Sequence, residues 1–131
     1  MSTAFALMLT ILSSGQDRNE SGPLKGFTKS PNEHIIVELR EPFTVRAVRG
    51  VVLDQSGAVM DRVLVEIQDA TGRTTGAKTD SKGRFKLHAV PEGTYRFKVT
   101  MMSFQSVVGK IVVSHQAEKA AEIKVMMNVG V

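Results

Sequence analysis

KTDSKGRFKLHAVPEGTYRFKV, residues 78–99, carries the clearest structural signals of this chain. Two tight-turn signals lie within it, Thr79-Asp80-Ser-Lys-Gly83 and Pro91-Glu-Gly93. An Asp side chain accepts hydrogen bonds from its own turn, Gly permits a positive φ, and Pro presets φ. After each turn, apolar and polar residues alternate, which is the period of a half-buried β-strand. The stretch therefore predicts a β-hairpin of two short strands.

The same alternation assigns the side chains of this stretch to two faces. The apolar residues share one parity and are predicted to build the core, with the Tyr95 hydroxyl reaching a backbone partner. The basic residues share the opposite parity, so a paired hairpin would present them together on one face. Such a face needs neighbouring acids such as Glu66, or else an anionic partner. The predicted interaction face consists of Arg84, Lys86, Arg96 and Lys98.

A second interpretation of these basic residues remains open. Lysines on a solvated sheet face also guard a β-protein against edge-to-edge pairing, without binding anything. On this interpretation the basic face has no partner, and the residues keep the chain soluble.

Short alternating runs separated by turn residues continue through the rest of the chain. Asp69-Ala-Thr-Gly72 is the signal of a four-residue hairpin loop. Pro42, between two β-type runs at 35–40 and 43–54, is expected to break or bulge the pairing there, because proline cannot donate to a strand ladder. About seven short strands with regularly spaced turns predict an all-β protein, specifically an antiparallel Greek-key β-sandwich.

Length and composition limit the possible functions. A chain of 131 residues is long enough for one domain with a core. The absence of cysteine excludes disulfides, thiolate nucleophiles and cysteine-based metal sites. A formal net charge of +4 attracts anionic surfaces weakly. The basic residues occur singly and no nucleic-acid recognition motif is present, so we expect no nucleic-acid partner.

The amino-terminal part of the chain predicts export. An apolar run from Ala4 to Leu12 is followed by small residues, in the order of an export signal, although no basic residue precedes the run. The run is too short to span a bilayer as a helix, so no membrane span is expected. We expect a signal peptide at 1–15, an irregular arm or linker at 16–33, and a β-sandwich domain at 34–131 of a secreted or periplasmic protein.

Several motifs occur together in an order that resembles the carboxypeptidase regulatory-like domain, a transthyretin-like (prealbumin-like) β-sandwich. The resemblance covers about residues 47–127 and combines Gly-x-Val-x-Asp, Thr-Asp-x-x-Gly-x-Phe and Pro-x-Gly-x-Tyr. It implies a non-catalytic module with a structural or protein-interaction role in the bacterial envelope or outside the cell. The partner would be an unknown protein or envelope component. The residues of the structural motif are Gly50, Asp54, Gly57, Asp80, Gly83, Phe85, Pro91, Gly93 and Tyr95.

Catalytic and metal-binding signals are weak. His34, His88 and His115 lack a spacing that would hold them together, and each acidic turn offers one carboxylate. We therefore expect no catalytic, cofactor-binding or metal-binding residues. Transthyretin-like hydrolases resemble one another in a carboxy-terminal Tyr-Arg-Gly-Ser, whereas this chain ends in Met-Met-Asn-Val-Gly-Val. An enzyme of that type is the least favoured alternative.

Carbohydrate binding is the more serious alternative, because starch-binding-like sandwiches share the general architecture. Sugar sites stack a pyranose ring on an exposed aromatic side chain. The chain contains no Trp, and its single Tyr has the inward parity. An exposed Phe27 or Phe43 would have to take that role.

Overall fold

The computed structural model describes residues 22–31, 33 and 35–130. The predicted signal peptide and His34 lie outside these residues. Within them, a short 3-10 helix, η3 (Gly22–Leu24), precedes nine strands. The strands are β1 (Ile36–Glu38), β2 (Phe43–Val45), β3 (Val48–Asp54), β4 (Leu64–Gln68), β5 (Thr74–Lys78), β6 (Arg84–Leu87), β7 (Gly93–Thr100), β8 (Ser106–Val113) and β9 (Ile123–Met127).

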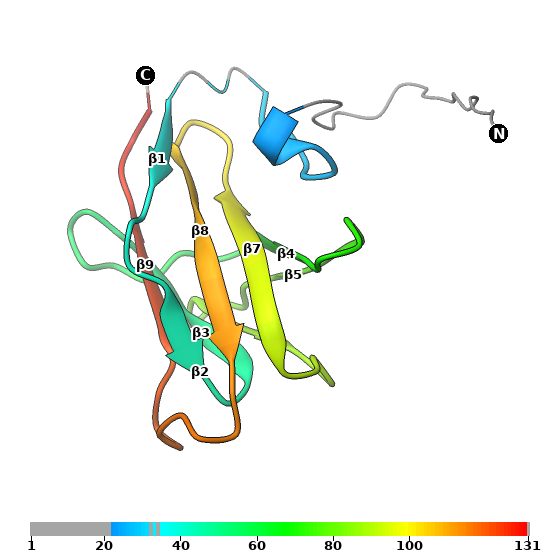
Figure 1. Ribbon diagram of the computed structural model, residues 1–131. Helices are drawn as coiled ribbons and strands as arrows, with labels where there is room; N and C mark the ends of the chain where they lie inside the picture. Colours follow the sequence, from blue (N-terminus) through cyan, green and yellow to red (C-terminus); the bar gives the residue numbers. More distant parts are fainter. Residues whose placement is uncertain (1–21, 32, 34, 131) are drawn as a thin grey trace, which may run out of the picture.

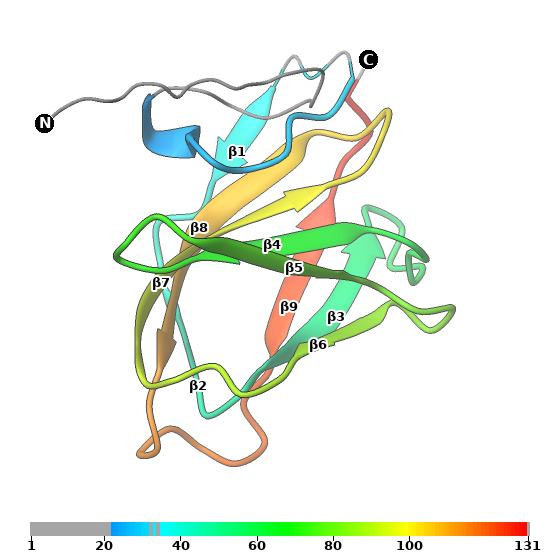
Figure 2. The same cartoon turned by 90° about the vertical axis from the view of Figure 1, so that its right-hand side faces the viewer.

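The strands form two sheets that pack on each other as a sandwich (Figures 1 and 2). The larger sheet has six strands in the order β1-β8-β7-β4-β5, with β2 also pairing with β8, and the smaller sheet is β6-β3-β9. The predicted all-β sandwich is confirmed. Its pairing is mixed rather than wholly antiparallel, because β1 and β2 run parallel to β8 and β3 runs parallel to β9.

The break that Pro42 predicts is present between β1 and β2. β1 pairs with β8 along Ser106–Val108 and β2 pairs with it along Ile111–Val113, so this edge has no registered partner opposite Gly109 and Lys110. Because proline lacks an N–H group, the ladder is interrupted and resumes after it. The chain at this interruption lines one side of the candidate site.

The core lies between the sheets and is built by the inward side chains of both. Phe97 is buried against the backbone of β8, where a Cβ added to Gly109 would stand only 2.7 Å from its ring. The ring of Phe43 packs beside it, with centroids 5.9 Å apart. Most of the deeply buried core residues are β-branched, which suits a pleated surface packed on one face. They include Val45, Val48, Val52, Val63, Val65, Val99, Ile111, Val113, Ile123 and Val125.

The predicted hairpin within residues 78–99 is wrong. β6 pairs with β3 in the smaller sheet, while β7 pairs with β4 and β8 in the larger sheet. The link between them crosses from one sheet to the other, with Ala89 at a φ of 57°. The Pro91-Glu-Gly93 turn therefore forms a corner of the sandwich. The parity within each strand still holds, since Phe85 and Tyr95 are buried on the core side.

The corner is tied by Tyr95. Its hydroxyl donates a hydrogen bond to the Pro91 carbonyl oxygen at 2.7 Å, and its side chain is 8% exposed. Burial, together with the nearby charge of Asp69, raises the pKa of Tyr95 above its ordinary value. One aromatic side chain thus anchors the start of β7 in the core while holding the turn before it.

Three turns in the described part of the chain share one arrangement. Asp54, Asp69 and Asp80 are each followed three residues later by a glycine, whose N–H donates to the aspartate carbonyl oxygen at 2.9 or 3.0 Å. Each carboxylate accepts two further backbone N–H groups of its own turn. The three glycines all have a positive φ, between 74° and 90°, which suits a residue without a Cβ. They are Gly57, Gly72 and Gly83.

Candidate functional site

The structure separates the four basic residues that were predicted to share a face. Arg84 and Lys86 lie on the smaller sheet, whereas Arg96 and Lys98 lie on the larger sheet. In both strands these side chains point away from the core, so the two pairs face opposite sides of the sandwich. The predicted common face is therefore wrong, because it required β6 to pair with β7.

On the smaller sheet, the basic residues are partly neutralised by their neighbours. Arg84 forms an ion pair with Glu122 at 3.3 Å, and both side chains are partly exposed. Lys86 lies opposite Arg49, whose guanidinium donates to the Lys119 carbonyl oxygen at 2.9 Å. Exposed pairs of this kind contribute little to stability. This face has the character of a solvated sheet surface.

Lys98 is fully buried, although its parity is outward as predicted. Its ammonium group donates to the Thr28 carbonyl oxygen at 2.8 Å and lies 2.9 Å from a carboxylate oxygen of Glu33. Both partners belong to residues 22–33, which we call the arm. The arm packs against the outer face of the larger sheet, so Lys98 has no access to a partner (Figure 1).

The arm is held by a polar network across β4, β7 and β8. The Glu66 carboxylate lies opposite Lys98 in the register and accepts both the N–H and the hydroxyl of Thr28, each at 2.9 Å. The Ser106 hydroxyl donates to Glu33 at 2.6 Å. Because each buried oxygen has a donor, the charges can remain buried beneath the arm.

Glu33 illustrates the electrostatic balance of this network. Burial by itself would raise its pKa, but hydrogen bonds from Ser106, Lys98 and Ser30 and the positive charge of Lys98 outweigh burial. The pKa of Glu33 is consequently held below its ordinary value. The carboxylate is therefore ionised at neutral pH, which keeps its pair with Lys98 intact.

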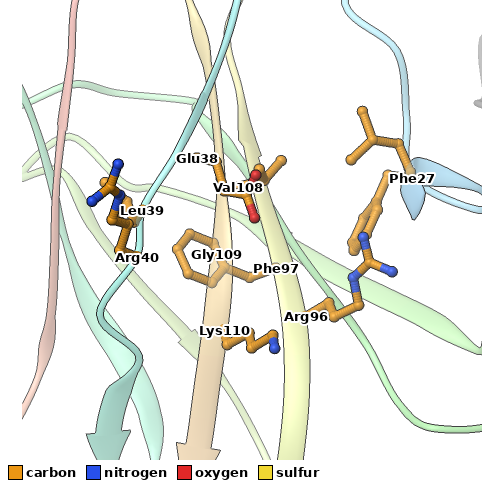
Figure 3. A pocket seen from close by; sticks show the side chains of 10 residues that line it. Phe27, Glu38, Leu39, Arg40, Arg96, Phe97, Val108, Gly109 and Lys110 are labelled. Atoms are coloured by element: carbon orange, nitrogen blue, oxygen red, sulfur yellow. The ribbon is translucent and has the colours of Figure 1, made fainter.

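A groove of about 430 Å³ lies beside the arm on the same side of the molecule (Figure 3). Leu24 and Phe27 of the arm line one side, and the segment 38–40 at the end of β1 lines the other. The groove is located at Gly109 and Lys110, where β8 pairs with β7 on one side but has no strand partner on the side of β1 and β2. The arm and the interruption at Pro42 together create this hollow.

The groove carries an excess of positive charge. Its lining contains Arg40, Arg96 and Lys110 but one acid, Glu38. Arg96 and Lys110 lie directly opposite each other on β7 and β8, an arrangement that is unfavourable for like charges. The side chains of all three cations are exposed and form no hydrogen bond or ion pair with any residue that the structure describes. The groove is therefore suited to an anionic group.

Sequence reasoning included Arg96 in the site but missed Arg40 and Lys110. Lys110 has the outward parity on β8, so the same alternation that placed Arg96 on the outer face could have placed Lys110 there too. Arg40 is the last residue of the predicted run 35–40, but it lies outside the strands because β1 ends at Glu38. The arm itself was expected to be an irregular linker; its signal was Phe27, an aromatic residue in an otherwise polar stretch, which is now 0% exposed.

The described residues also bear on metal binding, membrane spanning and aromatic exposure. Within residues 22–31, 33 and 35–130, no cluster of three or more His, Asp or Glu side chains could bind a metal ion. The same residues include no helix with the length and apolar character needed to cross a membrane. Of the aromatic rings described, Phe43 and Phe104 are the least buried, and both are half-buried.

The order of the motifs along β3 to β9 agrees with a known family. The family model described as the carboxypeptidase regulatory-like domain matches residues 47–127. The chain belongs to the carboxypeptidase regulatory-like domain family. The predicted family is thus confirmed. In this regulatory-like domain the match extends from the start of β3 to the end of β9, so the arm, β1 and β2 lie outside the matched residues.

Two solved structures are similar to this regulatory-like domain. One is 3-chlorocatechol 1,2-dioxygenase from Rhodococcus opacus 1CP, 15% identical over 77% of this chain and 68% of that chain, with a TM-score of 0.47. The other is hydroxyquinol 1,2-dioxygenase from Pseudomonas putida DLL-E4, 10% identical over 88% and 68%, with a TM-score of 0.48. Similarities this low give no indication of activity. A search of curated proteins finds no match.

Proposed function

We propose that this regulatory-like domain is a non-catalytic module with a protein-interaction role in the bacterial envelope or the extracellular space. Its contact surface is the groove between the arm and residues 38–40. The observation that supports this role is the set of three exposed, unpaired cations around a hollow with apolar walls. Concave surfaces that combine apolar walls with a few convergent polar groups are typical of binding sites.

The side chains of the groove suit protein binding better than carbohydrate binding. Guanidinium and ammonium groups are strong hydrogen-bond donors, and the apolar surface of Leu24 and Leu39 adds contact area. For a carbohydrate-binding module, an exposed aromatic ring would be the supporting observation. The described rings do not supply one, since Phe27 is fully buried and Phe43 is half-buried.

Site-specific cross-linking tests the location of the contact. A photoreactive amino acid replaces Glu38 in the groove and, as the matched control, Glu118 in the β8–β9 loop, because both side chains are exposed acids. Each protein is added to envelope extract and irradiated. We expect a discrete cross-linked protein from position 38 that excess wild-type chain competes away, and no such product from position 118.

Two outcomes would argue against the proposal. Equal labelling from both positions would indicate nonspecific contact, and absence of a competed product from position 38 would remove the groove as a contact surface. Recovery of the native protein from the cytosol alone would contradict the location in the envelope.

A further inference from the structure

The charges of the groove indicate what kind of partner it takes. Three cations and one carboxylate leave a net charge of +2 at its surface. Because Arg96 and Lys110 repel each other across the strand pair, an anion placed between them removes an unfavourable interaction as well as adding two favourable ones. The groove is thus electrostatically arranged for a negatively charged ligand.

Arg96 and Arg40 favour carboxylates in particular orientations. A guanidinium presents its N–H donors as a planar fork that matches the two oxygens of a carboxylate. Lys110 adds a third charge that can follow the ligand on a flexible stem. All three residues line the hollow, with Arg96 and Lys110 on one side of the segment 38–40 and the guanidinium of Arg40 on the other (Figure 3). A ligand with carboxylates at more than one position can reach all of them.

The shape and the walls of the groove favour a peptide over other anions. Leu24 on the arm side and Leu39 on the opposite side offer apolar contacts that an inorganic anion would leave unused, whereas Phe27 is buried beneath the arm and offers none. A planar membrane surface would contact the exposed cations but could not enter the concave hollow that they line. An acidic peptide can place carboxylates on the cations and apolar side chains against the walls.

We infer that the groove binds an acidic peptide segment of a partner protein, with carboxylate side chains on Arg96, Lys110 and Arg40 and an apolar side chain against the arm. This inference rests on the proposed interaction role and specifies the chemistry of its partner. The buried network under the arm acts in a positioning role, because it holds Leu24 and Phe27 in the wall.

Fluorescence anisotropy with the full chain tests the inference. The probe is a fluorescein-labelled, end-capped octapeptide of alternating Glu and Leu, and the control peptide has Gln in place of Glu. The groove variant carries Arg96→Gln and Lys110→Gln. The matched variant carries Lys86→Gln and Lys124→Gln, which removes the same charge from exposed positions of the smaller sheet.

We expect the Glu-Leu peptide to bind the wild-type chain and the matched variant alike. Its affinity should fall by about tenfold or more in the groove variant and should fall as salt increases. All four substituted side chains are exposed, so thermal unfolding midpoints close to the wild-type value will establish that the variants are folded.

Several results would overturn the inference. Equal binding of the Gln-Leu peptide would remove the requirement for carboxylates, and an equal loss in both variants would indicate general charge attraction. Complete competition by millimolar inorganic phosphate would indicate a small-anion site, and equal binding to phosphatidylglycerol vesicles would indicate a membrane surface. The acidic peptide could fail to bind while position 38 still cross-links a protein that excess wild-type chain displaces. That result would keep the proposed interaction role and reject the acidic partner.

Discussion

The ammonium group of Lys98 has three oxygen atoms within hydrogen-bond distance, from Thr28 and from both carboxylate oxygens of Glu33. A buried ion pair contributes little net stability compared with an apolar pair of the same volume. Removing one partner is different, because it leaves an uncompensated charge on a side chain that has no exposed surface. At the level of single residues, we therefore expect docking of the arm to depend on Glu33.

Glu33→Gln is expected to release the arm while the sandwich stays folded. The substitution keeps the size of the side chain but leaves Lys98 without a counter-ion, at a cost on the order of 3 kcal/mol, and Lys98 can regain water only if the arm moves away. Hydrogen exchange at the Thr28 amide, which donates to Glu66, should accelerate by at least about tenfold. Glu118→Gln, which changes an exposed acid, should leave that exchange rate unchanged. Unaltered protection in Glu33→Gln would show that the ion pair does not hold the arm.

The turn aspartates predict a loss of stability in acid. Hydrogen bonds from their own turns hold the pKa values of Asp54, Asp69 and Asp80 below the ordinary value of 3.8. A carboxyl whose folded pKa is lowered stabilises the protein above its unfolded pKa, and that contribution disappears as the pH falls through the folded pKa. We expect urea unfolding midpoints to decrease as the pH falls from about 5 through 3.8 and below.

A variant separates this effect from general acid sensitivity. Asp80→Asn keeps a carbonyl oxygen that can accept the N–H groups of Lys82 and Arg84, but it does not titrate. Its midpoint should decrease less than that of the wild type over the same pH range. Parallel pH curves for the two proteins would exclude the turn as a source of the acid sensitivity.

At the level of elements, the contact between β3 and β9 has the least tolerance for added volume. Gly50 lies opposite Ile123 in this parallel pair, and a Cβ at Gly50 would stand 1.9 Å from the Ile123 carbonyl oxygen. The obstructing atom belongs to the backbone, so the two strands would have to separate. The structure thus shows why glycine is needed here, for close approach of a neighbouring strand.

Gly50→Ala is expected to destabilise the domain by about 3 kcal/mol, because β3 and β9 must separate within their sheet to admit one methyl group. Gly57→Ala is the matched control, since its Cβ would meet no atom within 4 Å and its cost comes from a φ of 89° alone. That cost should be about 1 kcal/mol. Urea unfolding of the two variants measures both values. A smaller loss for Gly50→Ala than for Gly57→Ala would contradict the close-approach argument.

Within the elements, features set by residues close in sequence could be predicted from the sequence, whereas the pairing of strands could not. The directions of Phe85, Tyr95 and Lys98 followed from period-2 alternation, which depends on neighbours two positions away. The pairing of β6 with β3 did not follow, because the same turn residues suit a hairpin and a corner between sheets. Turn chemistry limits the local path of the chain and does not choose the sheet that receives the next strand.

At the level of the whole molecule, the core of the sandwich does not include the arm. The core cluster is built from residues 45–127, and Phe27, although fully buried, is not part of it. The arm instead covers the opposite, outer face of the larger sheet, through Thr28, Glu33 and Phe27. Removing the arm would therefore expose polar residues of the outer face and leave the core closed.

Deletion of residues 1–33 is expected to leave a cooperative β-sandwich with a reduced thermal midpoint. Lys98 and Glu66 would then become hydrated, so neither would remain as an unpaired buried charge. The groove would lose the wall formed by Leu24 and Phe27, and binding of the acidic peptide should weaken. Circular dichroism and the anisotropy measurement check these two effects. Loss of cooperative unfolding would show that the arm is part of the core structure.

The strands, their parity and the aspartate–glycine turns can be inferred from the amino-acid sequence because each depends on residues within about four positions of one another. The β-sandwich and the family follow from the order of these local signals. The burial of Lys98 and the groove depend on contacts between distant residues: Glu33 meets Lys98 across 65 positions, and Thr28 meets Glu66 across 38. The alternation of residues along a strand cannot predict such contacts, because a side chain that points outward from its sheet can face either water or another part of the chain.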